Sequence, residues 1–384
     1  MPPNADRLWF LDWVRVCAFG LLIPYHVGFF YSSWDWAANS FYAGPAIEPL
    51  LLFSSPWRLP LLFFVSGAAC RFLRDRSSAG DFMRSRLLRL GVPLVFGVLI
   101  ICAPIEYIEG RTHGALGPGF LQFLPRYWTH DPTLRYGLDW EHLWFVAYVL
   151  TYALLVAPLR DAIVRVAARI DPLLRHRWFV AIVPMLLIAV PFCILRGWFP
   201  VTNNLVRDWS NHVVFLPCFL FGFASVRSQH WRTVEDLRWP ALIACVPLYA
   251  ILIWSNTQYD MDATLRITMR FVRCAYLWAA LLVVLGFARR WLNRPSATIA
   301  WLNRGVFCFY IIHQPVIVVV GYALTQQRVG VVGEAAVVLL TTIAACLATY
   351  VAADRLGAAK ILFGLPRGSM RRQRLAQQQL AEQS

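Results

Sequence analysis

The sequence predicts an all-α, polytopic membrane helix bundle of about ten transmembrane helices, and three observations support this prediction. Hydrophobic residues make up 59% of the 384 residues and charged residues only 15%, whereas a soluble domain is about 25% charged. Apolar stretches recur along the chain, many of them near the roughly 20 residues that a helix needs to cross a bilayer. Arginines gather in alternate loops, which is the positive-inside pattern. Residues 1–384 are therefore expected to form a single integral membrane domain.

Ten spans follow from the hydropathy of the chain. They are expected at 9–31, 48–72, 89–108, 142–159, 178–196, 212–226, 239–256, 267–288, 306–324 and 334–353. Of the 36 Lys and Arg residues, 25 fall on one side of the membrane, seven on the other and four within spans. The basic side faces the cytoplasm, so both termini are predicted to be cytoplasmic. The polar segment 366–384 is expected to be a flexible cytoplasmic tail.

Charge and cysteine content exclude several classes of protein. A formal charge of +15 would suit a nucleic-acid-binding protein, but membrane topology explains its concentration in alternate loops, so no nucleic-acid partner is expected. The nine cysteines lie in or beside apolar spans and form no CxxC or other metal-ligand spacing. They are interpreted as small packing residues, without a disulfide framework and without a metal site.

The first span carries three ionisable residues, Asp12, Arg15 and His26. Such groups are costly inside a membrane and mark functional sites by default. At ~100° per residue the three share one polar stripe, with His26 ~16.5 Å beyond Arg15 along the axis. Pro24 is expected to kink this helix. The structural interpretation is an Asp12–Arg15 ion pair with His26 as a hydrogen-bonding residue between helices, and the functional one is a catalytic histidine.

Arg58 lies in the second span, between Trp57 and Pro60. It either donates hydrogen bonds to carbonyls that Pro60 leaves unbonded or lines a cavity that His26 faces. In the same span, the small residues Ser66 and Gly67 predict that two helices approach each other closely.

A basic segment, FMRSRLLRLGVP at 82–93, leads into the third span. Arg86 and Arg89 are three residues apart and share a helix face, with Arg84 nearby. Anchoring at the cytoplasmic rim explains these residues, and taken alone the pattern favours it. The sharper interpretation is a clamp for the phosphates of an anionic cofactor, because arginine offers forked, permanently charged donors.

The largest external loop, 109–141, is rich in glycine, proline and aromatic residues. Aromatic side chains suit a membrane interface, so short interfacial or re-entrant pieces are predicted here. The alternative is a platform on which a sugar ring stacks.

Further candidates lie at the start of the fourth span and within the ninth. Glu141 and His142 sit at the outer mouth of the fourth span, and Trp144 follows one turn later. Glu141 is either an N-terminal helix cap or part of a site, and His142 is either an interfacial residue or part of the same site. His313 precedes Pro315, so it either bonds a carbonyl that the proline leaves unbonded or lines a pocket.

Five motifs occur in order along nearly the whole chain: LDWVRVCAFGLLIPYH, LLFFVSG, FMRSRLLRLGVP, HLWFV and FYIIHQP. Together they resemble the acyltransferase 3 family of integral membrane O-acyltransferases. Within that family, the runs YHVGFFYSSWDW and WRLPLLFFVSG are most similar to members associated with acylating, often succinylating, periplasmic glucans.

The resemblance implies roles for matching residues. His26 matches the family's catalytic histidine, and Arg15 matches its first-helix arginine. Arg86 and Arg89 match the arginine pair linked to acyl-CoA. Recurrent positions without a settled role are matched by Asp12, Trp144 and His313.

The residues and the resemblance together predict an acyltransferase of the bacterial inner membrane. It is expected to move an acetyl or succinyl group from cytoplasmic acyl-CoA, as co-substrate, to a hydroxyl of an extracytoplasmic glycan such as a periplasmic glucan. His26 is expected to be the general base, by direct transfer or through an acyl-histidine; no metal is implied. The predicted catalytic residues are His26, Arg15 and Asp12; the predicted cofactor-binding residues are Arg86, Arg89 and Arg84; the predicted substrate-binding residues are Arg58, Trp144, His142, Glu141 and His313.

Two other classes compete with this prediction. A transporter or exporter of an anionic solute would use arginines inside spans to line its path and His26 to relay protons; those arginines are Arg15, Arg58, Arg270 and Arg273. Transporters are often built from repeats, and none is visible here. A membrane sensor without chemistry would leave the polar stripe unexplained.

Overall fold

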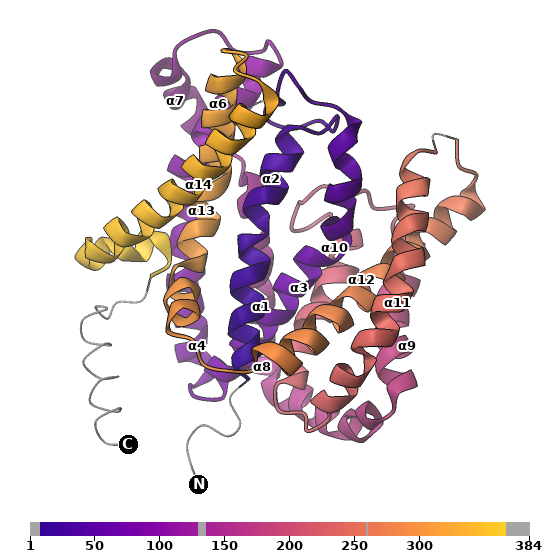
Figure 1. Cartoon of the computed structure of the whole chain (residues 1–384). Helices are drawn as coiled ribbons and strands as arrows, with labels where there is room; N and C mark the ends of the chain where they lie inside the picture. Colours follow the sequence, from indigo (N-terminus) through magenta and orange to yellow (C-terminus); the bar gives the residue numbers. More distant parts are fainter. Residues whose placement is uncertain (1–7, 130–135, 259, 366–384) are drawn as a thin grey trace. The chain divides into compact units, whose positions relative to one another are not determined.

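The computed structural model describes residues 8–129, 136–258 and 260–365, and these residues form helices and connecting loops without strands. The α-helices, coloured along the sequence in Figure 1, are α1 (Trp9–Gly20), α2 (Leu22–Phe30), α3 (Glu48–Arg74), α4 (Ala79–Arg86), α5 (Val92–Phe96), α6 (Ala103–Thr112), α7 (Phe120–Trp128), α8 (Trp144–Ile170), α9 (Arg177–Leu195), α10 (Trp209–Ser225), α11 (Trp231–Asn256), α12 (Ala263–Leu292), α13 (Ala297–Thr325) and α14 (Val331–Arg355). The predicted tail, 366–384, lies outside the described residues.

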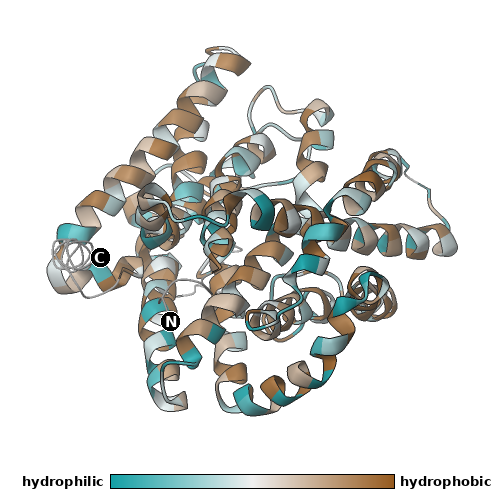
Figure 2. Cartoon of the chain, turned by 60° about the horizontal axis from the view of Figure 1, so that its bottom comes forward, coloured by the Kyte–Doolittle hydropathy of each residue, from teal (hydrophilic) through white to brown (hydrophobic). Residues whose placement is uncertain are grey.

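The described residues contain nine helical segments that are long and apolar enough to cross a membrane. They confirm the prediction of an all-α, multi-span protein. The remaining predicted span, 212–226, corresponds to α10, which has 17 residues. Hydrophobic residues dominate the long helices in Figure 2, and many large apolar side chains are exposed on them. In a membrane such side chains face lipid, because a bundle helix without a polar outer face is suited to an apolar solvent.

A break at Leu21 separates α1 from α2 within the first predicted span. Pro24 explains this break, because it has no N–H to donate to the carbonyl four residues earlier, at Gly20. The helix is therefore interrupted about one turn before Pro24, while the expected kink itself stays a prediction.

The chain divides into two compact units, which are described separately below. The first unit comprises Met1–Leu21, Glu48–Met83 and Thr151–Asn303. The second unit comprises Leu22–Ile47, Arg84–Leu150 and Arg304–Ser384.

Helices α3 and α10 of the first unit cross at two glycines. A Cβ atom added at Gly67 would lie 1.9 Å from the carbonyl oxygen of Phe219, and one added at Gly222 would lie 1.9 Å from that of Phe64. The two backbones are therefore closer than any side chain permits. This contact confirms the predicted role of Gly67 in close helix packing.

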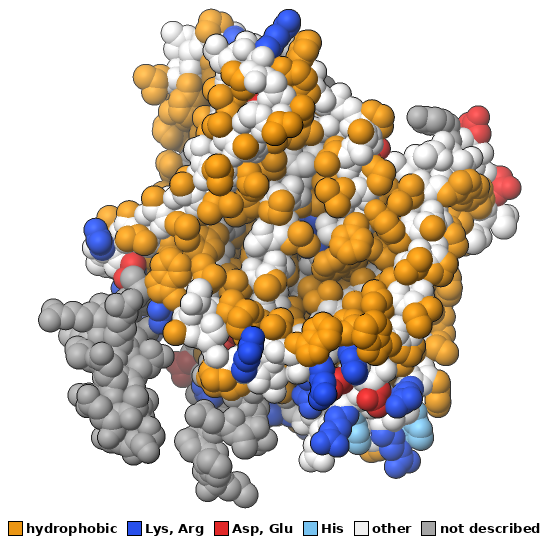
Figure 3. All heavy atoms as spheres, viewed as in Figure 1, with side chains coloured by type: hydrophobic (Ala, Val, Ile, Leu, Met, Phe, Trp, Pro, Cys, Tyr) orange, Lys and Arg blue, Asp and Glu red, His pale blue; other side chains and the backbone are white. Residues whose placement is uncertain are grey.

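Basic residues gather at one end of the first unit. Figure 3 shows Lys and Arg side chains over the lower ends of α9, α11 and α12, which lie side by side in Figure 1. Acidic partners interleave with them: Arg177 pairs with Asp236 at 2.9 Å, and Arg289 with Glu235 at 3.7 Å. Such a charged end is what a membrane protein presents to water and lipid headgroups.

Asp75, the residue after α3, joins three arginines of this unit, which come from α3, from α8 and from the residues after α10. Its carboxylate accepts hydrogen bonds from Arg71 at 2.8 Å, Arg160 at 2.8 Å and Arg227 at 3.2 Å. Its side chain is only 10% exposed, so these charge-assisted bonds are partly shielded from water. Although burial raises the pKa of Asp75, the hydrogen bonds from Arg160 and Arg71 outweigh it and lower the pKa.

We expect Asp75→Asn to destabilise the protein by about 1–3 kcal/mol at pH 7, because the arginines lose their charged acceptor. A carboxyl whose pKa is lowered by folding stabilises the fold above its unfolded value, about 3.9, and that stability is lost as the pH falls through the folded value. The difference in melting temperature between wild type and variant should therefore be full at pH 7 and shrink below about pH 4. A difference that is the same at both pH values would contradict this role of the charge.

The second unit has its own core, made by α2, α6, α13, α14 and the segment that follows α2. Buried residues from all five contribute to it, among them Phe30, Ala38, Ile105, Ile317 and Val338. A satellite of this core lies under α7, where Phe123 and Tyr127 pack against Ala103 of α6. The Tyr127 hydroxyl donates to the carbonyl of Val98. The loop 109–141 therefore contains a short helical piece, α7, and the interfacial or re-entrant position expected for it stays a prediction.

All nine cysteines lie in the described ranges, and all are free thiols. Six of them are buried. This agrees with the interpretation of cysteine as a small packing residue in the spans.

Candidate active site

The second unit brings together three histidines from three separate segments. His26 lies on α2, His313 lies on α13, and His142 lies in the short turn before α8. The ring centroids of His26 and His313 are 5.0 Å apart, and those of His142 and His313 are 5.4 Å apart. His313 is 1% exposed and His142 is 7% exposed, whereas His26 is half-buried.

Two acceptors lie around Nδ1 of His26. This nitrogen lies 2.9 Å from the carbonyl oxygen of Leu22 and 3.1 Å from Nε2 of His313. A carbonyl oxygen only accepts, so Nδ1 carries the hydrogen. Trp36, from the segment after α2, stacks on the imidazole with the ring centroids 6.1 Å apart and the planes at 18°. The ring of His26 is therefore held in one orientation from two sides.

Pro315 shapes the part of α13 that carries His313. The proline has no N–H, so the carbonyl of Ile311, four residues earlier, lacks its helical donor. Nε2 of His142 lies 3.2 Å from that oxygen and serves as the replacement donor. Nδ1 of His313 lies 2.6 Å from a different carbonyl, that of Tyr310. The carbonyl left by the proline is therefore satisfied by His142 and not by His313.

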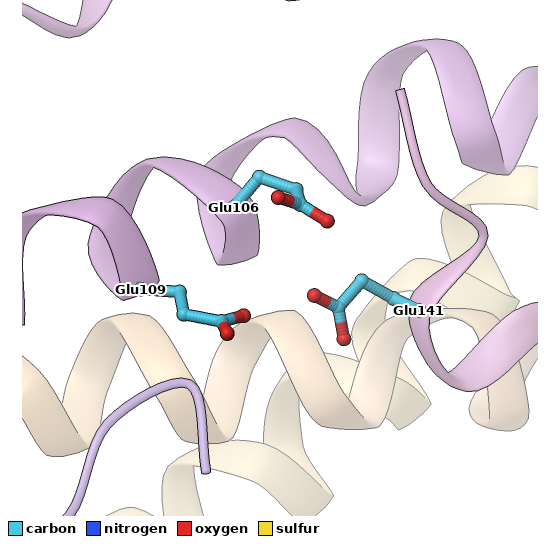
Figure 4. Close-up of side chains that lie close together, drawn as sticks. All are labelled: Glu106, Glu109 and Glu141. Atoms are coloured by element: carbon cyan, nitrogen blue, oxygen red, sulfur yellow. The ribbon is translucent and has the colours of Figure 1, made fainter. Parts of the chain in front are cut away.

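Three carboxyl groups of the second unit lie close together in space, and one of them, that of Glu141, is the sequence neighbour of His142. Glu106 and Glu109 extend from α6, and Glu141 precedes His142; an oxygen atom from each lies within 4.8 Å of the other two. Figure 4 shows the three groups pointing toward one another. Gln314, next to His313 on α13, donates to Glu141 at 3.4 Å. Like charges at this range repel strongly away from bulk water, so protons or a cation must lower the charge of the group.

Glu141 itself has a φ of +44° and stands before the first turn of α8. A positive φ is unfavourable for a residue with a Cβ. The backbone here turns the carboxyl group toward α6 instead of capping α8, which begins at Trp144. Trp144 packs edge-on against Tyr148, with the ring centroids 5.2 Å apart.

A fully buried carboxyl group, that of Glu334 at the start of α14, holds the segment that carries Trp36. One oxygen of Glu334 accepts hydrogen bonds from Ser40 Oγ at 2.5 Å and from the Tyr31 hydroxyl at 3.1 Å. The two hydroxyl groups are the donors and the carboxyl oxygen accepts both hydrogen bonds. These bonds fix both ends of the stretch between Tyr31 and Ser40.

The remaining first-span candidates belong to the first unit. Asp12 accepts a hydrogen bond from Nδ2 of Asn303 at 2.8 Å. Arg15 donates to the carbonyl of Val65 on α3 at 3.0 Å. Arg58, 3% exposed, lies on α3 with Nη1 3.4 Å from Oγ of Ser54. Because His26 belongs to the second unit, the polar stripe shared by Asp12, Arg15 and His26 stays a prediction.

The predicted cofactor arginines lie on the helical segment before α5. Arg84 and Arg86 end α4, and Arg89 lies in the π-helical turn Leu87–Gly91 that continues it. Arg84 and Arg89 are exposed and Arg86 is half-buried. Arginines in these positions can reach a ligand in solution. The same positions also suit arginines that anchor the protein at the edge of the membrane.

Sequence reasoning missed Trp36, Glu106, Glu109 and Glu334. The three glutamates carried a usable signal, because an ionisable residue within or beside an apolar span is a functional candidate by default. Trp36 carried none, since tryptophan is common near membrane interfaces and its partner lies on another element.

The family model described as "Acyltransferase domain" matches residues 8–352. The chain is also similar to proteins named glucans biosynthesis protein C from Escherichia coli O17:K52:H18 (strain UMN026 / ExPEC), O81 (strain ED1a) and strain SMS-3-5. Each is 25% identical over 347 residues, which cover 85% of this chain and 86% of the relative. No solved structure matches. These findings confirm both the family resemblance and the similarity to glucan-biosynthesis members.

Proposed function

The chain belongs to this acyltransferase family and is a multi-pass membrane acyltransferase, and from this premise we propose its reaction. The protein moves an acetyl or succinyl group from acyl-CoA to a hydroxyl of a glycan, and His26 is the general base. The names of the similar E. coli proteins support a glucan as the acceptor. In this proposal the protein lies in a bacterial inner membrane, the donor binds from the cytoplasm and the acceptor enters from the periplasm.

The observation that carries the proposal is the hydrogen-bonding state of His26. Because Nδ1 of the neutral ring carries the hydrogen, Nε2 carries the lone pair. A lone pair on an imidazole held by Trp36 and His313 is suited to take a proton, since imidazole is the side chain that changes charge near neutral pH.

The reaction follows from this state. Nε2 of His26 takes the proton of the acceptor hydroxyl while the oxygen attacks the thioester carbonyl carbon. The tetrahedral intermediate collapses, the carbon–sulfur bond breaks, and the thiolate of CoA leaves. The imidazolium gives its proton to that thiolate, so the products are an ester and free CoA, and His26 returns to its starting form.

Arg86 and Arg89 are proposed to bind the phosphates of acyl-CoA, because guanidinium groups form charge-assisted, forked hydrogen bonds with phosphate oxygens. We expect Arg86→Gln combined with Arg89→Gln to raise KM for acyl-CoA by about tenfold or more, as loss of two such bonds removes at least 1.4 kcal/mol of binding. The control is Arg175→Gln, an exposed arginine between α8 and α9 that is not among the predicted cofactor-binding residues. Steady-state kinetics at varied acyl-CoA checks this; unchanged KM with lower expression would identify the pair as membrane anchors.

The function is tested with the purified full-length protein, acetyl-CoA or succinyl-CoA, and a gluco-oligosaccharide acceptor. Release of free CoA thiol should depend on the acceptor, and mass spectrometry should show the acceptor heavier by one acyl group. If an anionic solute crosses proteoliposomes while acyl-CoA is not consumed, the protein is a transporter and the proposal fails.

A further inference from the structure

We propose that His313 is a positioning residue for His26: its Nε2 accepts the Nδ1 hydrogen of His26, fixes the tautomer that leaves Nε2 of His26 basic, and shares the positive charge that develops in the transition state. This inference rests on the proposed function and assigns to His313 a task other than the substrate binding predicted from the sequence.

The tautomer of His313 follows from its own contacts. Its Nδ1 lies 2.6 Å from the carbonyl oxygen of Tyr310, which only accepts, so this nitrogen carries the hydrogen. In the neutral ring the other nitrogen, Nε2, is then an acceptor. That acceptor lies 3.1 Å from Nδ1 of His26. The hydrogen on Nδ1 of His26 is therefore shared between Leu22 and His313.

The surroundings keep His313 in this orientation. It is 1% exposed, and the ring of His142 lies against it edge-on, at 90° between the planes. His142 is in turn bound to the Ile311 carbonyl that Pro315 leaves without a helical donor. The titratable groups in ring contact with the pair are His142 and Tyr310 beside His313, and Tyr25 beside His26.

Charge gives this contact a catalytic consequence. When His26 takes the acceptor proton at Nε2, its Nδ1–H becomes part of a cation, and hydrogen bonds from charged donors are roughly twice as strong as those between neutral groups. The His26–His313 bond therefore stabilises the transition state more than the ground state, which is the condition for raising kcat. The partner of a catalytic histidine usually supplies a negative charge; here a neutral nitrogen takes that place.

Two amide substitutions separate this role from packing. Asparagine at position 313 reaches only as far as the Nδ1 atom of histidine, so it can donate to the Tyr310 carbonyl but offers His26 no acceptor. Glutamine is one methylene longer and can place its amide oxygen where Nε2 of histidine lies. Both variants are uncharged and polar, so each serves as the folding control of the other.

We expect His313→Asn to lower kcat by about 30- to 100-fold with KM for acyl-CoA and for a gluco-oligosaccharide within about threefold, a loss of about 2–3 kcal/mol. His313→Gln should recover about tenfold of that loss.

The acidic limb of the pH–rate profile should move to lower pH in His313→Asn, because the imidazolium of His26 loses an acceptor. In the His26→Ala background, His313→Asn should cause no further loss, because residues that act as a unit are non-additive.

Several results would overturn the inference. Equal kcat in the Asn and Gln variants with an unmoved pH profile would make His313 a packing residue. A raised KM for the oligosaccharide at unchanged kcat would return it to substrate binding. If His26→Ala is inactive while His313→Asn keeps wild-type kcat, this inference alone fails; if His26→Ala is fully active, the proposed function of His26 fails first. Melting temperatures of the purified variants identify any loss that comes from folding.

Discussion

Replacing His26 with alanine should lower kcat for acyl transfer by about 10²–10⁴-fold, the range that a general base contributes. The ring is held by Trp36 and by the hydrogen bond to His313, so its removal takes away a proton acceptor in a fixed position. Binding of acyl-CoA should persist, because the predicted donor site is elsewhere in the sequence. The measurement is acceptor-dependent release of CoA thiol by purified wild type and variant.

The control for this variant is His176→Ala, since His176 is an exposed histidine that precedes α9 in the first unit. It should retain wild-type kcat. Melting temperatures and acyl-CoA binding of both variants should stay close to wild type. An active His26→Ala protein would remove the general base from the mechanism, and a His26→Ala protein that no longer folds would assign the residue to structure.

The largest expected effect on folding lies where α3 and α10 cross. Gly67→Ala should lower the melting temperature strongly, because the new Cβ atom would stand 1.9 Å from a backbone oxygen of Phe219. Neither helix can relieve that clash by rotating a side chain, so the helices must separate and lose the packing between them. Overpacking of a core costs about 1–3 kcal/mol and sometimes more, and here the obstacle is backbone.

Gly20→Ala is the matched control, since an added Cβ at Gly20 meets nothing within 4 Å. Alanine is intrinsically better than glycine within a helix by about 0.5–1 kcal/mol, so this variant should be neutral or slightly more stable. Scanning fluorimetry and size-exclusion profiles of the two purified variants test the contrast. Equal melting temperatures for both would show that α3 and α10 are not in contact at Gly67.

Much of the fold could be predicted because the membrane imposes a simple pattern on the sequence. Apolar runs predicted where the helices occur, but the predicted spans were shorter than the helices. The eighth span was expected at 267–288, whereas α12 runs from Ala263 to Leu292. Hydropathy detects only the part of a helix that crosses the hydrocarbon, while the backbone hydrogen bonds continue into polar residues. Helix α10 has only 17 residues and contains Pro217, so it is close to the shortest length at which hydropathy can identify a membrane span.

The candidate site was predictable residue by residue but not as an arrangement. His26 and His313 could each be identified as a polar residue in an apolar span. Their hydrogen bond could not, because it joins positions 287 residues apart and depends on how α2 and α13 pack. Glu106 and Glu109 escaped notice because the predicted end of the third span fell between them, at residue 108, whereas α6 carries both.

Pro315 makes α13 a less regular helix and at the same time ties it to another part of the chain. In a regular helix the carbonyl oxygen of Ile311 would accept a hydrogen bond from the backbone N–H of residue 315. Because Pro315 has no N–H, this oxygen accepts a hydrogen bond from His142 instead. A substitution such as Pro315→Ala would restore an internal donor, and that donor would compete with the imidazole for the same oxygen. A change chosen only to strengthen the helix would thus loosen the connection between α13 and the start of α8, so irregularity at this position is a requirement for cohesion of the second unit.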